Sequence, residues 1–202
     1  MGIPQYINLS KKTGEEHFYM GEEELDIKII NFWRWSQSDL LSNSLRGILA
    51  EYLVATVLGV DGGIRTEWDA YDLTSENGVK IEVKSSAYIQ SWQQVSDSNI
   101  SFNIKKTKGW NSKTNEYSNE LKRQADVYIF CLLKHRDKET VNPLNLNQWE
   151  FYILPTKILN EKKGDQQSIS LNPLLKLNPV ITDYKGLKRA ILDILRFYVS
   201  TL

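Results

Sequence analysis

A nearly continuous apolar run, Asp126 to Leu133 (DVYIFCLL), is the feature that most limits what this chain can fold into. A strand of this composition is typically buried on both faces, so other elements must cover both sides of its sheet. Apolar residues recur with a period near 3.6 in Ser38 to Gly59 and in Tyr184 to Thr201, which predicts two amphipathic helices. The pattern therefore predicts an α/β protein with a mixed β-sheet flanked by α-helices.

Shorter apolar or alternating segments predict further strands. They span residues 68–73, 79–88, 99–105 and 149–154. The polar, lysine-rich segment 106–124 is expected to form a loop followed by a short helix, and 156–161 one or two helical turns. The expected order is a helix, three or four antiparallel strands, a helix, two strands and a helix.

The N-terminal region differs in composition from the rest of the chain. Residues 1–26 are polar and acidic, which is typical of a surface arm or a short leading helix, whereas Ile27 to Trp35 is rich in large apolar side chains that must be buried somewhere. We expect one domain over residues 1–202, with an arm (1–35), a core (36–135) and a C-terminal extension (136–202).

Composition excludes several classes of protein. The 202 residues carry a formal net charge of zero, so any binding to nucleic acid must rest on local basic patches or on a metal ion. Cys131 is the only cysteine, which excludes a disulfide framework and a cysteine-rich zinc site. No apolar segment reads as a membrane span or secretory signal, so a cytoplasmic location is expected. No glycine-rich phosphate loop is present, so ATP is not expected as a ligand.

The segment Asp72 to Lys84 (DLTSENGVKIEVK) carries the chemistry. Alternation along the strand places Glu82 and Lys84 on one face and Val83 on the other. A three-residue loop ending at Gly78 would place Asp72 opposite Glu82, whereas a two-residue loop would place it on the core face. Burying an unpaired carboxylate in the core costs several kcal/mol, so the three-residue loop is favoured.

Side chains of directly opposed strand residues lie close together, so the carboxylates of Asp72 and Glu82 can share one Mg²⁺, which Mn²⁺ can replace. Lys84, on the same face, can reach a scissile phosphate or an attacking water. A divalent ion and a lysine together supply what phosphodiester hydrolysis needs. Glu51 on the first long helix is a further candidate, because Gly47 and Ala55 leave its flank open. The alternative is that Glu51 is a solvated helix residue and that Lys80, Glu82 and Lys84 form only cross-strand ion pairs.

Glu51, Asp72 and the Glu82-Val83-Lys84 element together resemble the PD-(D/E)xK nuclease superfamily, over residues 46–102 or so. The resemblance implies a restriction-endonuclease-like fold and a metal held by Asp72, Glu82, Glu51 and the Val83 carbonyl. This sequence departs from the superfamily's pattern at one position, because Tyr71 and not proline precedes Asp72. Gln90 is a weak further candidate, because some members of the superfamily place a glutamine near the site.

Basic residues could bring DNA to such a site. The weaker candidates for substrate contact are Arg46, Lys105, Lys106 and Lys108. The last three lie in the net-positive segment 105–123, which includes Trp110 and Tyr117, and the alternative is a solvated lysine loop. The chain is therefore expected to be a metal-dependent endodeoxyribonuclease with a restriction or defence role, and to form a homodimer. The alternative is a non-catalytic nucleic-acid-binding or scaffold protein that reuses the fold.

Overall fold

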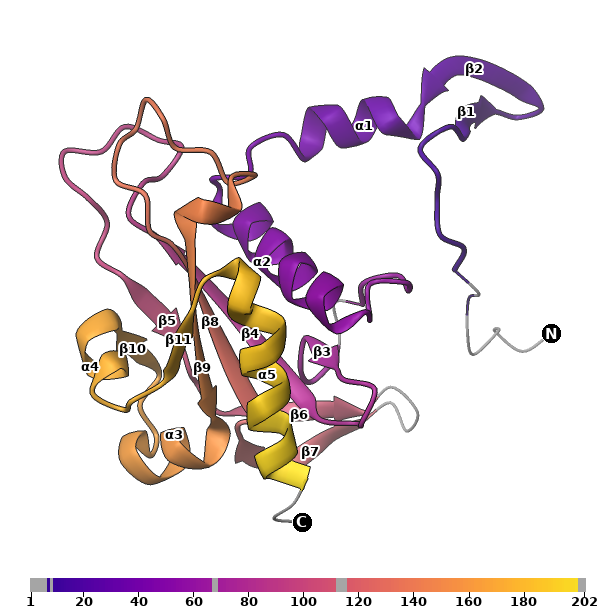
Figure 1. Cartoon of the computed structure of the whole chain (residues 1–202). Coiled ribbons are helices and arrows are strands. Elements are labelled where there is room, and N and C mark those ends of the chain that lie inside the picture. The colour runs from indigo at the N-terminus through magenta and orange to yellow at the C-terminus, as the bar shows by residue number, and fades with distance from the viewer. Residues whose placement is uncertain (1–6, 8, 67–68, 112–115, 200–202) are drawn as a thin grey trace.

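A five-stranded mixed β-sheet forms the centre of the protein in the computed structural model, which describes residues 7, 9–66, 69–111 and 116–199 (Figure 1). In spatial order its strands are β11 (Val180–Thr182), β9 (Trp149–Pro155), β8 (Val127–Leu133), β4 (Lys80–Ala87) and β3 (Leu73–Thr74). β4 and β8 run parallel, and the other neighbouring strands are antiparallel. The predicted α/β fold with a mixed sheet is thus confirmed.

Both faces of the sheet are covered. The helices α2 (Asn43–Leu58) and α5 (Tyr184–Val199) pack on one face, around the inward side chains of β4, β8 and β9 (Figure 1). The opposite face is covered by the ribbon of β5 (Ser101–Asn103) and β10 (Ser168–Ser170), together with α3 (Thr156–Lys163) and α4 (Leu171–Leu175). All seven residues of β8 are buried, as the apolar run predicts for a central strand.

The ends of α2 follow from local chemistry. The Ser42 hydroxyl accepts a hydrogen bond from the Leu45 amide at the N-terminus, and Gly59 ends the helix in the left-handed conformation with φ 73°. The predicted end at Gly59 is confirmed. The start lies later than predicted, because the Asp39 carboxylate accepts the amides of Leu41 and Ser42 and holds residues 39–42 in turns.

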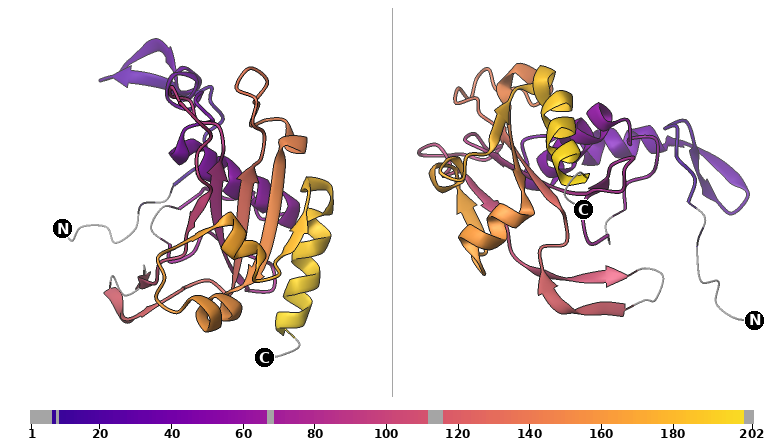
Figure 2. Two further views of the ribbon diagram at one scale, coloured as in Figure 1. Left: turned by 90° about the vertical axis from the view of Figure 1, so that its left-hand side faces the viewer. Right: turned by 60° about the horizontal axis from the view of Figure 1, so that its bottom comes forward.

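Three predictions about the strands were wrong in part. β5 leaves the central sheet and pairs with β10, so the sheet lacks the expected third antiparallel strand. The segment expected to be a loop and helix forms a hairpin of β6 (Thr107–Asn111) and β7 (Glu116–Lys122), in which Trp110 packs on Tyr117 across the strands (Figure 2). The strand expected over 68–73 is the two-residue β3, and residue 68 lies outside the described residues.

The connection between β8 and β9 ends in a short 3₁₀ helix, η1 (Leu146–Gln148). α3 follows β9 directly, as predicted, and α5 begins at the predicted Tyr184. None of the described helices is long and apolar enough to cross a membrane.

The N-terminal arm, defined here as residues 9–36, projects from the core (Figures 1 and 2). It contains the antiparallel strands β1 (His17–Met20) and β2 (Glu23–Lys28), followed by α1 (Ile29–Ser36). Of the two alternatives expected for the acidic segment, the short leading helix is wrong, because its described residues form a hairpin. The expectation that Ile27 to Trp35 is buried is wrong for this chain on its own, because no residue of α1 is buried and Trp35 is 84% exposed.

Candidate active site

The β3–β4 hairpin adopts the register that the three-residue loop requires. The Ser75 amide donates to the Val79 carbonyl at 2.9 Å, and Leu73 pairs with Ile81. Gly78 occupies the left-handed region with φ 79°, where a side chain would be strained. This register leaves Asp72 beside the Glu82 position.

Asp72, Glu82 and Lys84 meet at the edge of the sheet. The Lys84 Nζ atom lies 2.5 Å from a carboxylate oxygen of Glu82 and 3.9 Å from Asp72 Oδ2. The Val83 amide donates to the same Asp72 oxygen at 2.7 Å, which fixes the carboxylate against β4. The three side chains are mostly shielded from solvent, at 17–27% exposed. One cation therefore contacts both carboxylates.

Burial and like charge alter the protonation of this cluster. Burial, followed by the Glu82 carboxylate, raises the pKa of Asp72 to about 7, against the opposing effects of Lys84 and the Val83 hydrogen bond. Burial disfavours the charged form of Lys84, but the Glu82 and Asp72 carboxylates outweigh it and raise the pKa of the amine. Lys84 is therefore a cation at neutral pH.

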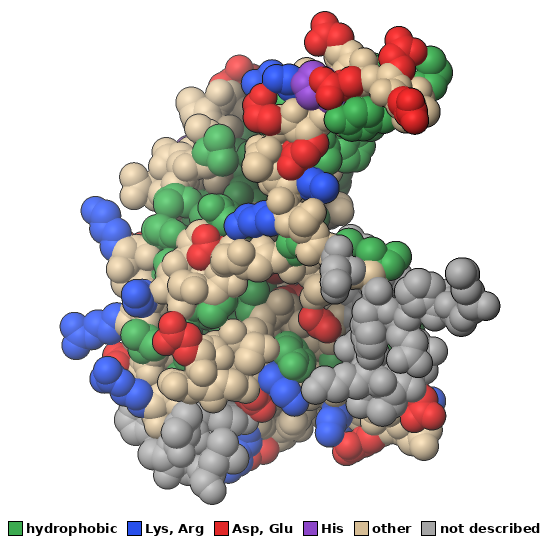
Figure 3. Space-filling model, turned by 90° about the vertical axis from the view of Figure 1, so that its right-hand side faces the viewer, with side chains coloured by type: hydrophobic (Ala, Val, Ile, Leu, Met, Phe, Trp, Pro, Cys, Tyr) green, Lys and Arg blue, Asp and Glu red, His purple; other side chains and the backbone are tan. Residues whose placement is uncertain are grey.

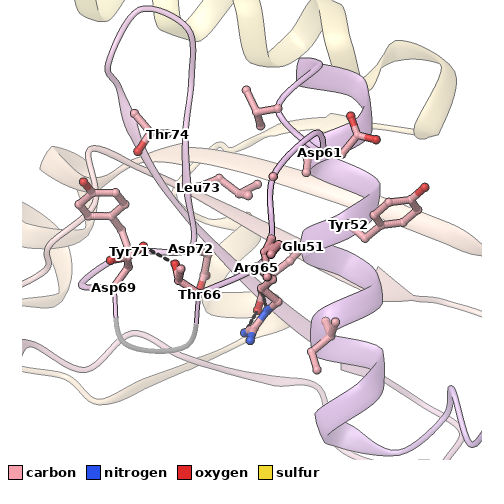
Figure 4. Close-up of a pocket in the computed structure, with 15 residues that line it drawn as sticks. Glu51, Tyr52, Asp61, Arg65, Thr66, Asp69, Tyr71, Asp72, Leu73 and Thr74 are labelled. Carbon is pink, nitrogen blue, oxygen red and sulfur yellow. Dashed lines mark hydrogen bonds and ion pairs between the residues drawn. The ribbon is translucent and has the colours of Figure 1, made fainter. Parts of the chain in front are cut away.

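Glu51 of α2 faces Asp72 across a cavity of about 300 Å³ (Figure 4). Its carboxylate, 13% exposed, receives two hydrogen bonds from Arg65, at 2.5 Å from Nε and 3.1 Å from the terminal nitrogen. The Glu51 charge also acts on the pKa values of Asp72 and Lys84, so the four predicted residues form one electrostatic cluster. Glu82 and Lys84 are not among the residues that line the cavity.

The donor set limits what kind of metal site can form. Among the residues that the structure describes, no three acidic, histidine or cysteine side chains are grouped as a ready metal site. Mg²⁺, however, usually takes only one or two carboxylates and completes its shell with water and substrate phosphate. Because a single ammonium already contacts both Asp72 and Glu82, this pair of carboxylates fits such a cation.

Arg46 and Gln90 are placed away from this cavity. The Arg46 side chain, 2% exposed, donates to the Leu41 carbonyl at 2.8 Å, to Gln90 Oε1 at 3.1 Å and to Asn43 Oδ1 at 2.6 Å. Burial lowers the pKa of Arg46 to about 10. Gln90 is also buried and donates to the Ala87 carbonyl. Both residues therefore join α2 to the end of β4, and neither offers a surface for DNA in this conformation.

The lysines at the start of β6 differ in their surroundings. Lys106 pairs with Asp165 at 2.8 Å, whereas the residues Lys105 and Lys108 are exposed. Arg123, at the end of the same basic segment, is buried and donates to the Ile104 carbonyl and to Asn160. The segment is thus partly structural, and fewer of its charges are available than the sequence suggests.

Two features of the site have no counterpart in the sequence analysis. The first is Arg65, because nothing in the spacing of the chain places this loop residue on Glu51. The second is a groove of about 620 Å³ between the β6–β7 hairpin and the start of β4, where Lys80, Lys122 and Trp110 contribute to the lining. Asp69 and Tyr71 line both this groove and the cavity, so the groove adjoins the cavity that Asp72 lines. The aromatic residues interleaved with lysines in 105–123 were the available signal for it.

Comparison with known proteins identifies the family. Residues 27–173 match the family model of bacteriophage T4 endonuclease IV. The match begins just before α1, ends in α4 and includes Glu51, Asp72, Glu82 and Lys84. No curated protein matches the chain. Because the model covers well over half of the chain, this protein belongs to the bacteriophage T4 endonuclease IV family, a family of nucleases.

Proposed function

We propose that this protein is a metal-dependent endonuclease that hydrolyses phosphodiester bonds in DNA, with a site of the PD-(D/E)xK type. The observation that carries the proposal is the contact of one ammonium, Lys84, with the carboxylates of both Asp72 and Glu82. The match to a nuclease family across these residues supports it.

The metal would be Mg²⁺, with Mn²⁺ as a substitute, held by Asp72, Glu82 and the Val83 carbonyl. Glu51 would join them or orient a water. When bound, the ion would neutralise phosphate charge and lower the pKa of a water molecule. The Val83 amide, which donates to Asp72, would keep one carboxylate oxygen in place while the other remains available.

Lys84 acts in this proposal as a fixed positive charge. Its raised pKa keeps it protonated at neutral pH, so it has no lone pair with which to accept a proton from water. It would hold the nucleophilic water by hydrogen bonding and stabilise the negative charge that develops on the phosphate oxygens. The two carboxylates it contacts would keep its ammonium at the reacting phosphate.

The groove beside the cavity gives the substrate a path. Lys80 and Lys122 offer charges to phosphates, and Tyr71 and Trp110 offer ring surfaces to bases. Lys80 lies 5.3 Å from the centre of the Tyr71 ring, so a phosphate and a base contact are available side by side. A protein with no net charge would then bind DNA through a local patch.

A restriction or defence role is proposed by analogy with small stand-alone nucleases, with repair or junction resolution as the next option. The rival proposal is a protein that binds nucleic acid without cutting it. It predicts DNA binding that persists when no cleavage occurs with any divalent ion.

Plasmid nicking in Mg²⁺ or Mn²⁺ tests the proposal. Asp72→Asn, Glu82→Gln and Lys84→Ala should each slow cleavage at least ~100-fold while the fold stays intact, because each removes several kcal/mol of transition-state stabilisation. Glu76→Gln, in the exposed turn of the same hairpin, is the matched control and should cleave normally. Wild-type rates in Lys84→Ala would rule out the mechanism.

A further inference from the structure

The N-terminal arm carries an apolar surface that the rest of the chain leaves uncovered. In the hairpin and α1 of the arm, six large apolar side chains are 44–84% exposed. They are Phe18, Tyr19, Met20, Ile27, Phe32 and Trp35. Large apolar side chains gathered in this number on one exposed unit indicate an interaction site.

The arm is nevertheless an ordered unit. The amides of Ile29 and Ile30 donate to the carbonyls of Glu16 and Gly14, at 2.9 and 3.1 Å, and join α1 to the segment before β1. Lys28 pairs with Glu15 at 2.7 Å across the same junction. The exposed side chains therefore sit on a preformed surface and not on an unstructured tail.

The charge of the arm indicates what can cover it. Its hairpin carries exposed carboxylates, and Figure 3 shows them clear of the core beside hydrophobic side chains. They are Glu22, Glu23, Glu24 and Asp26. Such a surface repels nucleic acid, and it also repels an identical hairpin placed against it. It favours a partner surface that is basic and partly apolar.

The chain itself provides such a surface on its opposite end. Val180 and Ile181, 43% and 52% exposed, lie on β11 at the edge of the central sheet, Val180 on the face that α5 covers and Ile181 on the opposite face. The helix α5, which contacts β11, presents exposed basic residues. They are Lys185, Lys188, Arg189 and Arg196, of which the two arginines pair with Asp193. Within the described part of the chain, neither Lys185 nor Lys188 forms an ion pair, and the same holds for Glu22 and Glu23.

We propose that two copies of this chain form a dimer by reciprocal arm exchange, in which the arm of each copy docks on β11 and α5 of the other. The acidic hairpin would face Lys185 and Lys188, and the apolar side chains of α1 would cover Val180, which lies on the sheet face that α5 covers. Each contact is made twice, as two-fold symmetry requires.

The available area is sufficient for a stable pair. An aromatic side chain buries about 150–250 Å². On that scale the six exposed side chains offer on the order of 600 Å² per arm, before the surface they cover is counted. Two reciprocal arms would therefore exceed the ~1,200 Å² at the lower end of specific interfaces.

Charge reversal and its compensation test the proposal directly. Two variants reverse the charge of one surface each. The arm reversal carries Glu22→Lys and Glu23→Lys, and the core reversal carries Lys185→Glu and Lys188→Glu on the exposed side of α5. Light scattering after size exclusion, without DNA or metal, should show a dimer for the wild type and monomers for each reversal alone. Mixing the two reversals, or combining all four substitutions in one chain, should restore the dimer, because both contacts regain opposite charges.

Apolar contact is tested by Trp35→Ser, which should weaken the dimer at least ~10-fold and leave the melting temperature of the monomer unchanged. Charge reversal of Lys162 and Lys163 on α3 is the matched control and should leave the dimer intact.

A monomeric wild type at ~100 µM, or reversals that fail to compensate each other, would overturn the proposal. So would a core reversal that weakens DNA binding without changing the oligomeric state. Because the oligomeric state is measured without DNA or metal, that measurement is independent of the nuclease assignment.

Discussion

Arg65 holds both carboxylate oxygens of Glu51, from a loop that separates α2 from β3. The pairing neutralises Glu51, which lines the same cavity as Asp72 (Figure 4). A divalent ion that uses Glu51 must therefore displace the Arg65 guanidinium from this carboxylate.

Replacing Arg65 should consequently strengthen metal binding. We expect Arg65→Gln to bind Mn²⁺ about 3–10-fold more tightly than the wild type in calorimetric titrations, because the competing cation is lost. Arg136→Gln, which breaks a distant surface pair with Asp97, should leave the affinity unchanged. Equal affinities in wild type and Arg65→Gln would show that Glu51 does not contribute to metal binding.

The raised pKa of Asp72 predicts a pH-dependent cost to the metal-free protein. Between pH 3.8 and about 7 the folded state keeps a proton on Asp72 that the unfolded state has lost, so the free energy of unfolding falls as pH rises. Asp72→Asn removes this cost and should gain stability over the wild type across that window, by on the order of 3 kcal/mol. Urea unfolding in EDTA at pH 4 to 8 measures the difference, and parallel profiles would contradict it.

Metal should narrow the stability difference between the wild type and Asp72→Asn. At 100 times its dissociation constant, Mn²⁺ should stabilise the wild type by about 2.7 kcal/mol, since the unfolded chain lacks the cluster. Asp72→Asn should show little shift. Thermal unfolding with EDTA and with Mn²⁺ makes the comparison, and equal shifts in the two proteins would remove Asp72 from the site.

DNA contact should depend on the groove. Lys80→Ala and Lys122→Ala, in a Lys84→Ala background that prevents cleavage, should each weaken binding and reduce the slope of log affinity against log salt by about 1. Lys105 and Lys108 are expected to add smaller effects of the same sign. Fluorescence anisotropy with a labelled oligonucleotide measures this, and an unchanged slope would place the DNA elsewhere.

Arg46 should behave as a structural residue. Arg46→Met removes a buried guanidinium and leaves the Gln90 and Asn43 oxygens without their donor, which should cost about 2–4 kcal/mol in urea unfolding. The affinity of the folded protein for DNA should stay close to wild type. A selective loss of DNA binding at full stability would return Arg46 to the substrate contacts.

Structural features that depend only on short stretches of the sequence could be predicted from it. The three-residue loop before Val79, the alternation through Glu82 and Lys84, and the glycine end of α2 all depend on backbone geometry within a few residues. The apolar run of β8 likewise predicted a central strand, since only a position between two covered faces removes every one of its side chains from water.

What the sequence determined alone is the local hairpin that brings Asp72 beside Glu82 and Lys84, together with the mixed sheet around β8. Tertiary structure decided the pairing of β5 with β10, the placement of Arg65 on Glu51, the burial of Arg46 and the exposure of Trp35. The physical reason is how far apart along the chain the interacting residues lie. Alternation and turn conformations are decided by neighbouring residues, whereas a long-range contact forms only if it is better than every competing partner once the whole chain has packed.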